Sequence, residues 1–249
     1  MSVRANFVQN HYAFSPNPWF IATFFFGQVM FQIAWIHKLF AFDPIGYHKL
    51  GSTPRADSAP DAGVNANTCT SSDDEEGVRV ALAYAPVYAL GSFCIAGWLL
   101  FWLRNDFVAS QILVTVNTFA QLFAVARLPL LTPKSSTIMR LTHVVAITFA
   151  GIGVLDLIDN GGVVLRYRAP PSILVQGITY TLFPVATAAS TPFFGAILLY
   201  DLFAIFVGQY DVSDAEQWSA RVGWTALATG GIVGVKALLS WRKKTGVRT

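Results

Sequence analysis

Charged side chains are scarce in this sequence. Asp, Glu, Lys and Arg together make up 12% of its 249 residues, against about a quarter of a typical soluble domain. A soluble protein of this size could not cover its surface with so few charges. The composition therefore excludes a soluble enzyme and a disordered chain, and a net charge of only +3 argues against a basic face for nucleic acid.

Cysteines and known catalytic motifs are also few. The two cysteines, Cys69 and Cys94, are not enough for a disulfide framework or a cysteine zinc site. The sequence contains no HxxH or HExxH motif, no GxGxxG motif at the start of a helix and no DDxxD motif within an apolar run. We therefore expect neither a metal ion nor a cofactor.

Long apolar runs dominate what is present. Apolar residues make up 54% of the chain, and its mean hydropathy is +0.49. A helix needs about 20 apolar residues to cross about 30 Å of hydrocarbon. Five runs approach or exceed this length, at residues 19–36, 80–103, 107–126, 139–158 and 219–241. The fourth run is expected to end at Asp159-Asn160-Gly161-Gly162.

A further apolar stretch, residues 172–209, is too long for one span. As a single helix it would rise about 57 Å, nearly twice the hydrocarbon thickness. Two helices joined by a tight turn near residues 189–192 fit better. The sequence thus predicts an all-α, polytopic membrane helix bundle of about seven transmembrane helices, forming a single membrane domain over residues 1–249. Six spans with a re-entrant segment are the alternative.

Basic residues divide unevenly between the two sides of such a bundle. Seven spans place five on the N-terminal side and eleven on the other, while Lys236 falls within a span. Cytoplasmic loops carry the excess of Lys and Arg. We therefore expect a multi-pass protein of the endoplasmic reticulum with a lumenal N-terminus and a cytosolic C-terminus. Residues 43–77, rich in Ser, Pro, Asp and Ala, would form a disordered cytosolic loop.

Carboxylates inside the predicted spans are functional candidates, because ionisable groups are costly in lipid. Asp156 and Asp159 are three residues apart and share a helix face. Asp201 is the most deeply placed acid. Asp106 suits a helix N-cap, and an interfacial role is also the simpler interpretation of Asp159, whereas for Asp156 both interpretations stand. The simpler alternative for Asp201 is an ion pair with Lys236.

Neutral polar and aromatic side chains extend the set of candidates. Gln28 and Gln32 are four residues apart, as are Asn117 and Gln121, so each pair shares one helix face. Hydrogen bonding between helices is the usual role of such residues in membranes, and lining a substrate cavity is the alternative. The 20 Phe, 8 Tyr and 7 Trp would either face lipid or form a cavity wall whose π-faces stabilise a cation.

Two stretches of the sequence carry a resemblance to a known family. Pro16–Phe20 (PNPWF) and Gln28–Phe40, together with the seven-span plan and the size, resemble small fungal integral-membrane meroterpenoid cyclases, in particular those of ascochlorin and ascofuranone-type pathways. The resemblance covers the layout of most of the chain. It implies a metal-independent terpene cyclase of secondary metabolism that acts, within membrane lipid, on a lipophilic small molecule, namely a farnesylated aromatic or quinone.

The resemblance also implies a mechanism. Such cyclases protonate an epoxide or olefin, and a base removes a proton after cyclisation. A carboxylic acid in an apolar site keeps its proton and can donate it, and a dry pocket prevents capture of the cation by water. Catalytic roles would then fall to Asp201 or Asp156 with assistance from Tyr200 or Tyr180. Substrate-binding roles would fall to Gln28, Asn117, Gln121 and Tyr180.

Two other classes of protein are alternatives. A sterol-isomerase-like or sterol-binding membrane protein would also use buried carboxylates and aromatics. Such proteins have fewer spans and an acid with a histidine in the first helices, where this chain has only glutamines. A non-enzymatic structural or transport-linked membrane protein would pair its buried acids and enclose no cavity.

Overall fold

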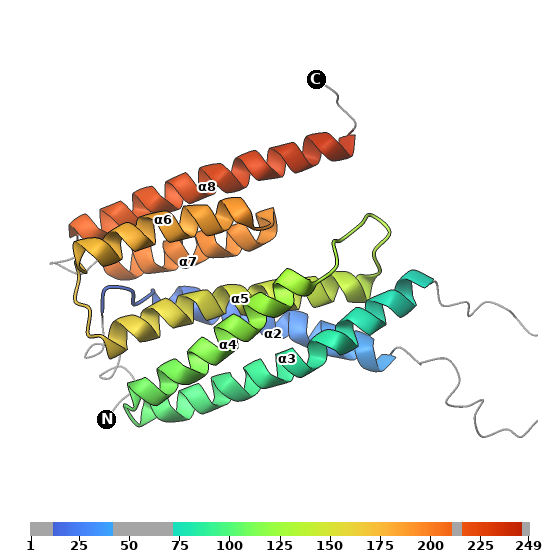
Figure 1. Cartoon of the computed structure of the whole chain (residues 1–249), viewed down its shortest axis with the longest axis horizontal. Coiled ribbons are helices and arrows are strands. Elements are labelled where there is room, and N and C mark those ends of the chain that lie inside the picture. Colours follow the sequence, from blue (N-terminus) through green and yellow to red (C-terminus); the bar gives the residue numbers. More distant parts are fainter. Residues whose placement is uncertain (1–11, 42–71, 211–215, 246–249) are drawn as a thin grey trace, which may run out of the picture.

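The fold is an antiparallel bundle of helices, seen in a computed structural model that describes residues 12–41, 72–210 and 216–245. Within these ranges there are seven helices and no strand, and successive helices alternate in direction (Figure 1). The predicted all-helical class is confirmed. The helices are α2 (Pro18–Ala41), α3 (Ser72–Leu103), α4 (Phe107–Arg127), α5 (Thr137–Val164), α6 (Ile173–Ala189), α7 (Pro192–Tyr210) and α8 (Glu216–Thr245).

Six of the seven helices are long and apolar enough to cross a membrane, and α6 is a shorter apolar helix of 17 residues. A rise of 1.5 Å per residue gives α6 about 25 Å, at the lower limit for a span. The predicted division of residues 172–209 into two helices is confirmed. Ser190 and Thr191 form the turn, where Thr191 Oγ1 accepts a hydrogen bond of 3.2 Å from Phe194 N and Pro192 opens α7.

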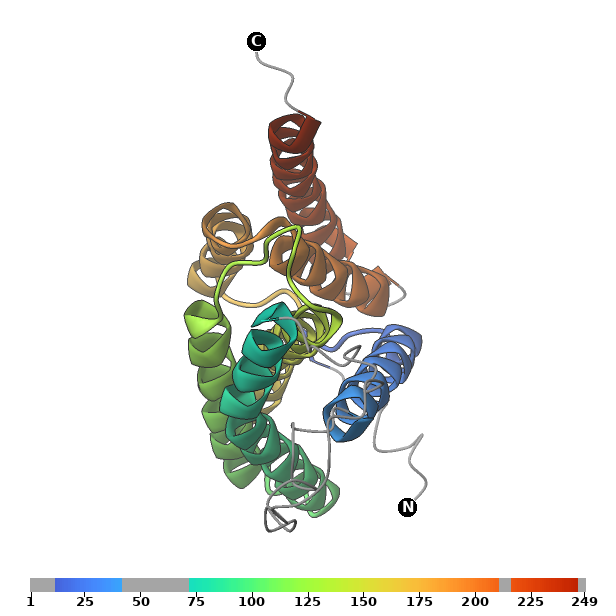
Figure 2. The same cartoon turned by 90° about the vertical axis from the view of Figure 1, so that its right-hand side faces the viewer.

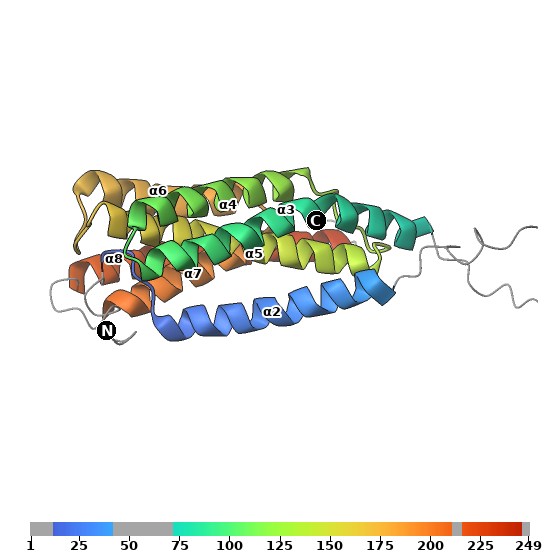
Figure 3. The same ribbon diagram turned by 90° about the horizontal axis from the view of Figure 1, so that it is seen from below.

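Helix α5 lies at the centre of the bundle. It packs against α2, α3, α4 and α7, with α6, α7 and α8 on one side and α2, α3 and α4 on the other (Figures 1 and 2). Gly151 allows α7 to come close, because a Cβ atom there would overlap the side chain of Ile197. Helix α2 runs along the outside of the bundle (Figure 3).

Helix α5 continues beyond its expected end near Ile158. Asn160 does not stop the helix, because its side chain accepts a hydrogen bond of 2.8 Å from Ser110 Oγ on α4. The helix ends instead at Val164, and Arg166, two residues later, has a φ of 53°. There Tyr167 N donates to Gly162 O at 2.9 Å, as in a Schellman C-cap. Asp159 therefore lies inside a helix rather than in a loop.

Helix α3 begins earlier than expected, at Ser72. Its first turn carries Asp73, Asp74 and Glu75, and negative charge stabilises a helix N-terminus. The last part of the loop predicted over residues 43–77 is therefore helical. The remainder, residues 43–71, lies outside the described residues.

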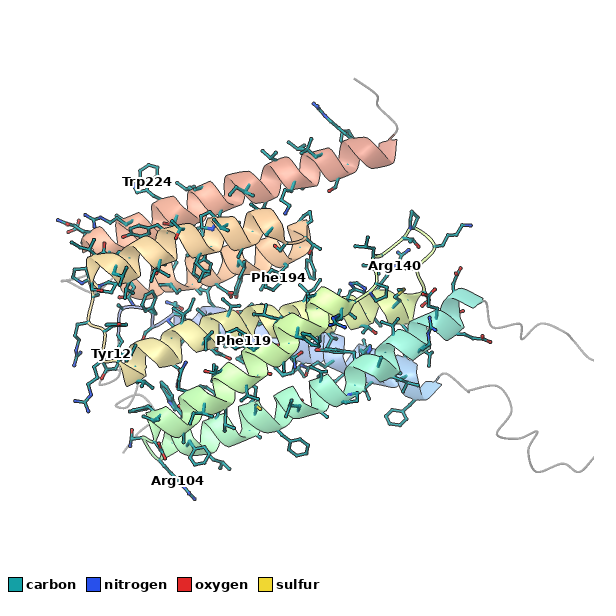
Figure 4. All side chains as sticks on the ribbon, viewed as in Figure 1. Tyr12, Arg104, Phe119, Arg140, Phe194 and Trp224 are labelled. Carbon is teal, nitrogen blue, oxygen red and sulfur yellow. The ribbon has the colours of Figure 1, made fainter. Side chains whose placement is uncertain are left out.

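Residues 12–17, here called the N-terminal segment, lie across the end of the bundle where α2 begins. Trp218 Nε1 donates a hydrogen bond of 2.6 Å to Ala13 O, and Gln209 Nε2 donates one of 2.9 Å to Tyr12 O. Asn17 N donates to Ala204 O at 2.9 Å. Figure 4 labels Tyr12 at this end of the molecule, which we call the N-terminal end. The segment thus covers the ends of α5, α7 and α8.

Candidate functional site

The clearest chemical feature of the interior is a set of three carboxyl groups, Asp156, Asp159 and Asp201, here called the acidic cluster. Asp201 on α7 has 0% exposure, and neither of its carboxyl oxygens has a hydrogen-bond partner among the described residues. Gly151 of α5 is in close contact with Ile197 of α7. Asp201, four residues after Ile197, therefore lies at the level of Asp156, and Asp159 lies one turn further on along α5. Helices α5 and α7 run in the same direction (Figure 1), so the three acids lie toward the same end of the bundle.

The sequence of α7 explains why Asp201 is buried. Leu198, Leu202 and Ile205 are buried on this helix with at most 1% exposure. Positions 198, 201, 202 and 205 follow the spacing of a single helix face. Phe194, one turn earlier, lies on the side of α7 that faces α5 (Figure 4). Asp201 therefore occupies a position in the apolar face that packs into the bundle core.

The expected alternative for Asp201, an ion pair with Lys236, is not present. Lys236 Nζ donates hydrogen bonds to the carbonyl oxygens of Thr187 at 2.8 Å and Ala188 at 2.7 Å, and to that of Ser190. A cation at a helix C-terminus satisfies carbonyls that have no partner within the helix. No cation of the described chain lies within ion-pair distance of Asp201.

Asp159 contacts the N-terminal segment. Ser15 Oγ donates a hydrogen bond of 3.2 Å to Asp159 Oδ1, and Tyr12 N donates one of 3.0 Å to Ser15 Oγ. No motif or spacing in the sequence marks Ser15 as a site residue. The rigid Ser15-Pro16-Asn17-Pro18 stretch is the one signal in the sequence that indicates an ordered segment there.

Tyr200, next to Asp201 in sequence, joins α7 to α2. Its hydroxyl donates a hydrogen bond of 2.7 Å to Phe20 O. Its ring lies 5.4 Å from that of Phe20 and 5.5 Å from that of Phe24, between ring centres. The ring of Phe203 lies 6.5 Å from that of Phe20. An aromatic patch therefore adjoins the position of Asp201 in α7.

Gln28 lies on the inner face of α2, two turns from the level of the acids. Trp35 Nε1 donates to Thr142 Oγ1 at 2.9 Å, which fixes α2 against the antiparallel α5. Seven residues make about two turns, so Gln28 lies at the level of Phe149, and Phe149 shares a face of α5 with Asp156 about 10 Å further along. Gln28 is 3% exposed, and its Oε1 accepts no hydrogen bond from the described part of the chain.

Asn117 and Gln121 lie together between α3 and α4. Gln121 Oε1 accepts a hydrogen bond of 2.8 Å from Tyr84 Oη, and its Nε2 donates to Val87 O at 3.1 Å. Both amides lie against Gly91, where a Cβ atom would overlap them. Gln121 therefore bonds between helices. Asn117 Nδ2 is buried and has no acceptor among the residues described.

Tyr180 lies between α6 and α8. Its hydroxyl donates a hydrogen bond of 3.0 Å to Gln176 Oε1, which also accepts one of 2.8 Å from Arg221 Nη1. Its ring packs 6.0 Å from that of Trp218, between ring centres. Through these contacts Tyr180 joins α6 to α8. None of them involves the acidic cluster.

Comparisons of the chain with models of protein families, with curated proteins and with solved structures find no match. Fold and site together define a polytopic helical membrane protein with an acidic cluster in its core. Within the described ranges, no three His, Cys, Asp or Glu side chains are grouped so that they could hold a metal ion. Because a helical bundle alone implies no activity, a function has to be inferred from the side chains of the site.

Proposed function

We propose that this protein is a membrane-embedded terpene cyclase that protonates an epoxide or olefin of a farnesylated aromatic or quinone and so starts cation cyclisation. The observation that carries the proposal is the carboxyl of Asp201, fully buried and without a hydrogen-bond partner among the described residues. An unpaired charge in an apolar medium is very costly. Asp201 should therefore be neutral, and its proton has no acceptor among the described residues. It is available for donation to a bound substrate.

An aromatic patch that includes Tyr200, the neighbour of Asp201 in α7, suits the cation that protonation creates. Tyr200, Phe20 and Phe24 form ring-to-ring contacts between α7 and α2. The face of an aromatic ring attracts positive charge. Exclusion of water by the packed helices would prevent premature capture of the cation. We assign Tyr200 a positioning role, because its hydroxyl proton is already donated to Phe20 O.

The other end of the substrate would lie at the level of Gln28 and Asn117. Gln28 Oε1 and Asn117 Nδ2 are a buried acceptor and a buried donor, each without a partner in the described residues. Buried polar groups in native proteins nearly always find a partner, and a ligand or water is the usual one when the protein supplies none. An oxygenated aromatic ring offers both a hydroxyl donor and an oxygen acceptor. A prenyl chain would then span the roughly 10 Å from this level to the level of the acidic cluster, where Asp201 would protonate it.

We also propose an endoplasmic-reticulum location with the N-terminal end facing the lumen. The helices long enough to span a membrane and their exposed apolar side chains support contact with lipid. Trp224, 71% exposed, points away from the bundle (Figure 4). A lipophilic substrate would reach the site from the same membrane.

The test is an assay of microsomes from a heterologous fungal host that expresses the chain. Farnesylated phenols with and without a terminal epoxide are supplied, and mass spectrometry with chromatography detects a product isomer of unchanged mass. We expect Asp201→Asn to lower turnover by about 10²–10⁴-fold, the usual contribution of a general acid. Asp106→Asn is the matched control, because Asp106 is an exposed acid at the same end that caps α4.

Two results would overturn the proposal. One is the absence of product from every such substrate at normal membrane abundance. The other is full turnover by Asp201→Asn. Saturable sterol binding together with no product would favour the sterol-binding class instead.

A further inference from the structure

The three acids of the acidic cluster are arranged in order of depth in the bundle. Protonation of the substrate by Asp201 does not by itself need the other two. Asp159 lies nearest the N-terminal end, where Ser15 Oγ contacts it at 3.2 Å. Asp156 lies one turn deeper on the same helix. Asp201 is the most buried member and belongs to a second helix. The three acids therefore run in order from the end of the bundle to its core.

Burial changes along this order. Asp159 and Asp156 are partly exposed, whereas Asp201 is fully buried. Asp156 Oδ2 and both oxygens of Asp201 have no hydrogen-bond partner in the described ranges. Gly151 and Ile197 are in close contact between the parallel helices α5 and α7, so Asp201, one turn after Ile197, lies at the level of Asp156. Tyr200, next to Asp201 in sequence, donates its proton to Phe20 O at 2.7 Å, so it offers no alternative route.

We propose that Asp159 and Asp156 form a proton path from the aqueous phase at the N-terminal end to Asp201. A carboxyl that has given up its proton in a dry core must regain one before it can act again. In each cycle one proton leaves Asp201 for the substrate, one passes from Asp156 to Asp201, one from Asp159 to Asp156, and one from water to Asp159. The cyclised cation releases one proton in return, so the sum is zero and no oxidant or reductant is needed. Chains of acidic side chains within membrane proteins are suited to this task.

Ser15 is a positioning residue in this path. Its hydroxyl is oriented because Tyr12 N donates to its oxygen, so its hydrogen points to Asp159. The N-terminal segment thereby fixes the entrance of the path without carrying the proton. As a consequence, water reaches Asp159 beside the N-terminal segment rather than through it.

The test measures proton exchange at Asp201 and does not require turnover. The full chain in lipid nanodiscs is transferred from H₂O to D₂O, and infrared spectroscopy follows the carbonyl band of the protonated Asp201 carboxyl. This band is assigned by its absence from the spectrum of Asp201→Asn. We expect Asp156→Asn and Asp159→Asn each to retain the band. In both variants the Asp201 proton should exchange for deuterium at least about tenfold more slowly. Asp159→Glu, which keeps a carboxyl, should restore fast exchange, and Asp106→Asn should exchange like the unaltered protein.

The outcomes separate this inference from the proposed function on which it rests. Exchange that is equally fast in Asp156→Asn and Asp159→Asn would overturn the path, whether or not the protein cyclises a substrate. Slow exchange in both variants would support the path even if no farnesylated phenol is converted. In an active protein, Asp156→Asn should complete its first turnover normally and slow later turnovers by about 100-fold. Equal slowing of the first and later turnovers would contradict a role in resupplying the proton.

Discussion

The hydroxyl of Tyr200 donates a hydrogen bond of 2.7 Å to the main-chain oxygen of Phe20 and so ties α7 to the first turn of α2. Asp201 is the next residue in α7, and its carboxyl is buried in the bundle core. The bond therefore fixes the rotation of the helix that carries the proposed acid. The hydroxyl proton of Tyr200, the only one that this side chain could donate, is already used in this hydrogen bond.

Replacing Tyr200 by Phe should test this positioning role. The ring contacts with Phe20 and Phe24 remain in Tyr200→Phe, and only the hydrogen bond is lost. Hydrogen bonds between helices in membranes are worth about 0.6 kcal/mol on average, so we expect a small loss of stability and turnover within about threefold of normal. Steady-state assays in microsomes would measure it. A fall of 100-fold or more would instead make Tyr200 a proton donor.

Gly208 should be essential for the docking of the N-terminal segment. A Cβ atom at this position would overlap the main chain of Ser15, Pro16 and Asn17. Main-chain atoms cannot move aside as a flexible side chain can, so Gly208→Ala should displace the segment. Overpacking of this kind typically costs about 1–3 kcal/mol.

Labelling with a membrane-impermeant maleimide would measure the displacement. The reporter is Ala13→Cys, placed at a fully buried position, in a chain whose two native cysteines are replaced by Ser. We expect protection of the reporter with Gly208 in place and labelling with Gly208→Ala. Gly177→Ala is the matched control, because no atom lies within 4 Å of a Cβ there. Continued protection in Gly208→Ala would show that the segment does not depend on this close approach.

Gln121 should act on stability rather than on chemistry. Its Oε1 accepts the hydrogen bond of Tyr84 at 2.8 Å in the buried interface of α3 and α4. Gln121→Met leaves that hydroxyl without its acceptor, which costs about 1–3 kcal/mol. Adding Tyr84→Phe removes the unsatisfied hydroxyl and should recover part of the loss, as a double-mutant cycle of unfolding in detergent would show. A double variant less stable than Gln121→Met alone would contradict this account.

The number and class of the helices could be predicted because they depend on local sequence. Apolar length identifies a span regardless of what packs around it. The turn of Ser190 and Thr191 follows from the impossible length of a single helix. Asp106 also behaves as its position predicts, since its carboxyl accepts a hydrogen bond of 3.2 Å from Ala109 N at the start of α4.

The partners of polar side chains could not be predicted, because they depend on contacts distant in sequence. Lys236 bonds to the end of α6, 46–49 residues away in sequence, instead of pairing with Asp201. The sequence predicts that Asn160 helps to end a helix, whereas its side chain bonds to Ser110 on α4. The N-terminal segment has no apolar periodicity, so its contact with Asp159 could be found only in three dimensions.

The orientation of the bundle should follow its basic residues. Arg104 and Arg140 lie at opposite ends of the molecule (Figure 4). At the N-terminal end, the described loops and helix ends carry Arg104, Arg166, Arg168 and Arg221, and the opposite end carries a larger number. From the positive-inside rule we expect the N-terminal end, with the proposed entrance to the acidic cluster, to face the lumen.

An added glycosylation acceptor can test this orientation. The chain has no Asn-X-Ser/Thr site of its own with X other than Pro, so any glycan must come from the one added. We expect an N-terminal extension that carries such a site to be glycosylated, and a C-terminal extension that carries the same site to remain unmodified. Gel mobility before and after endoglycosidase treatment would show the difference. The reverse pattern would place the entrance in the cytosol, and protons for Asp201 would then come from the cytosolic rather than the lumenal pool.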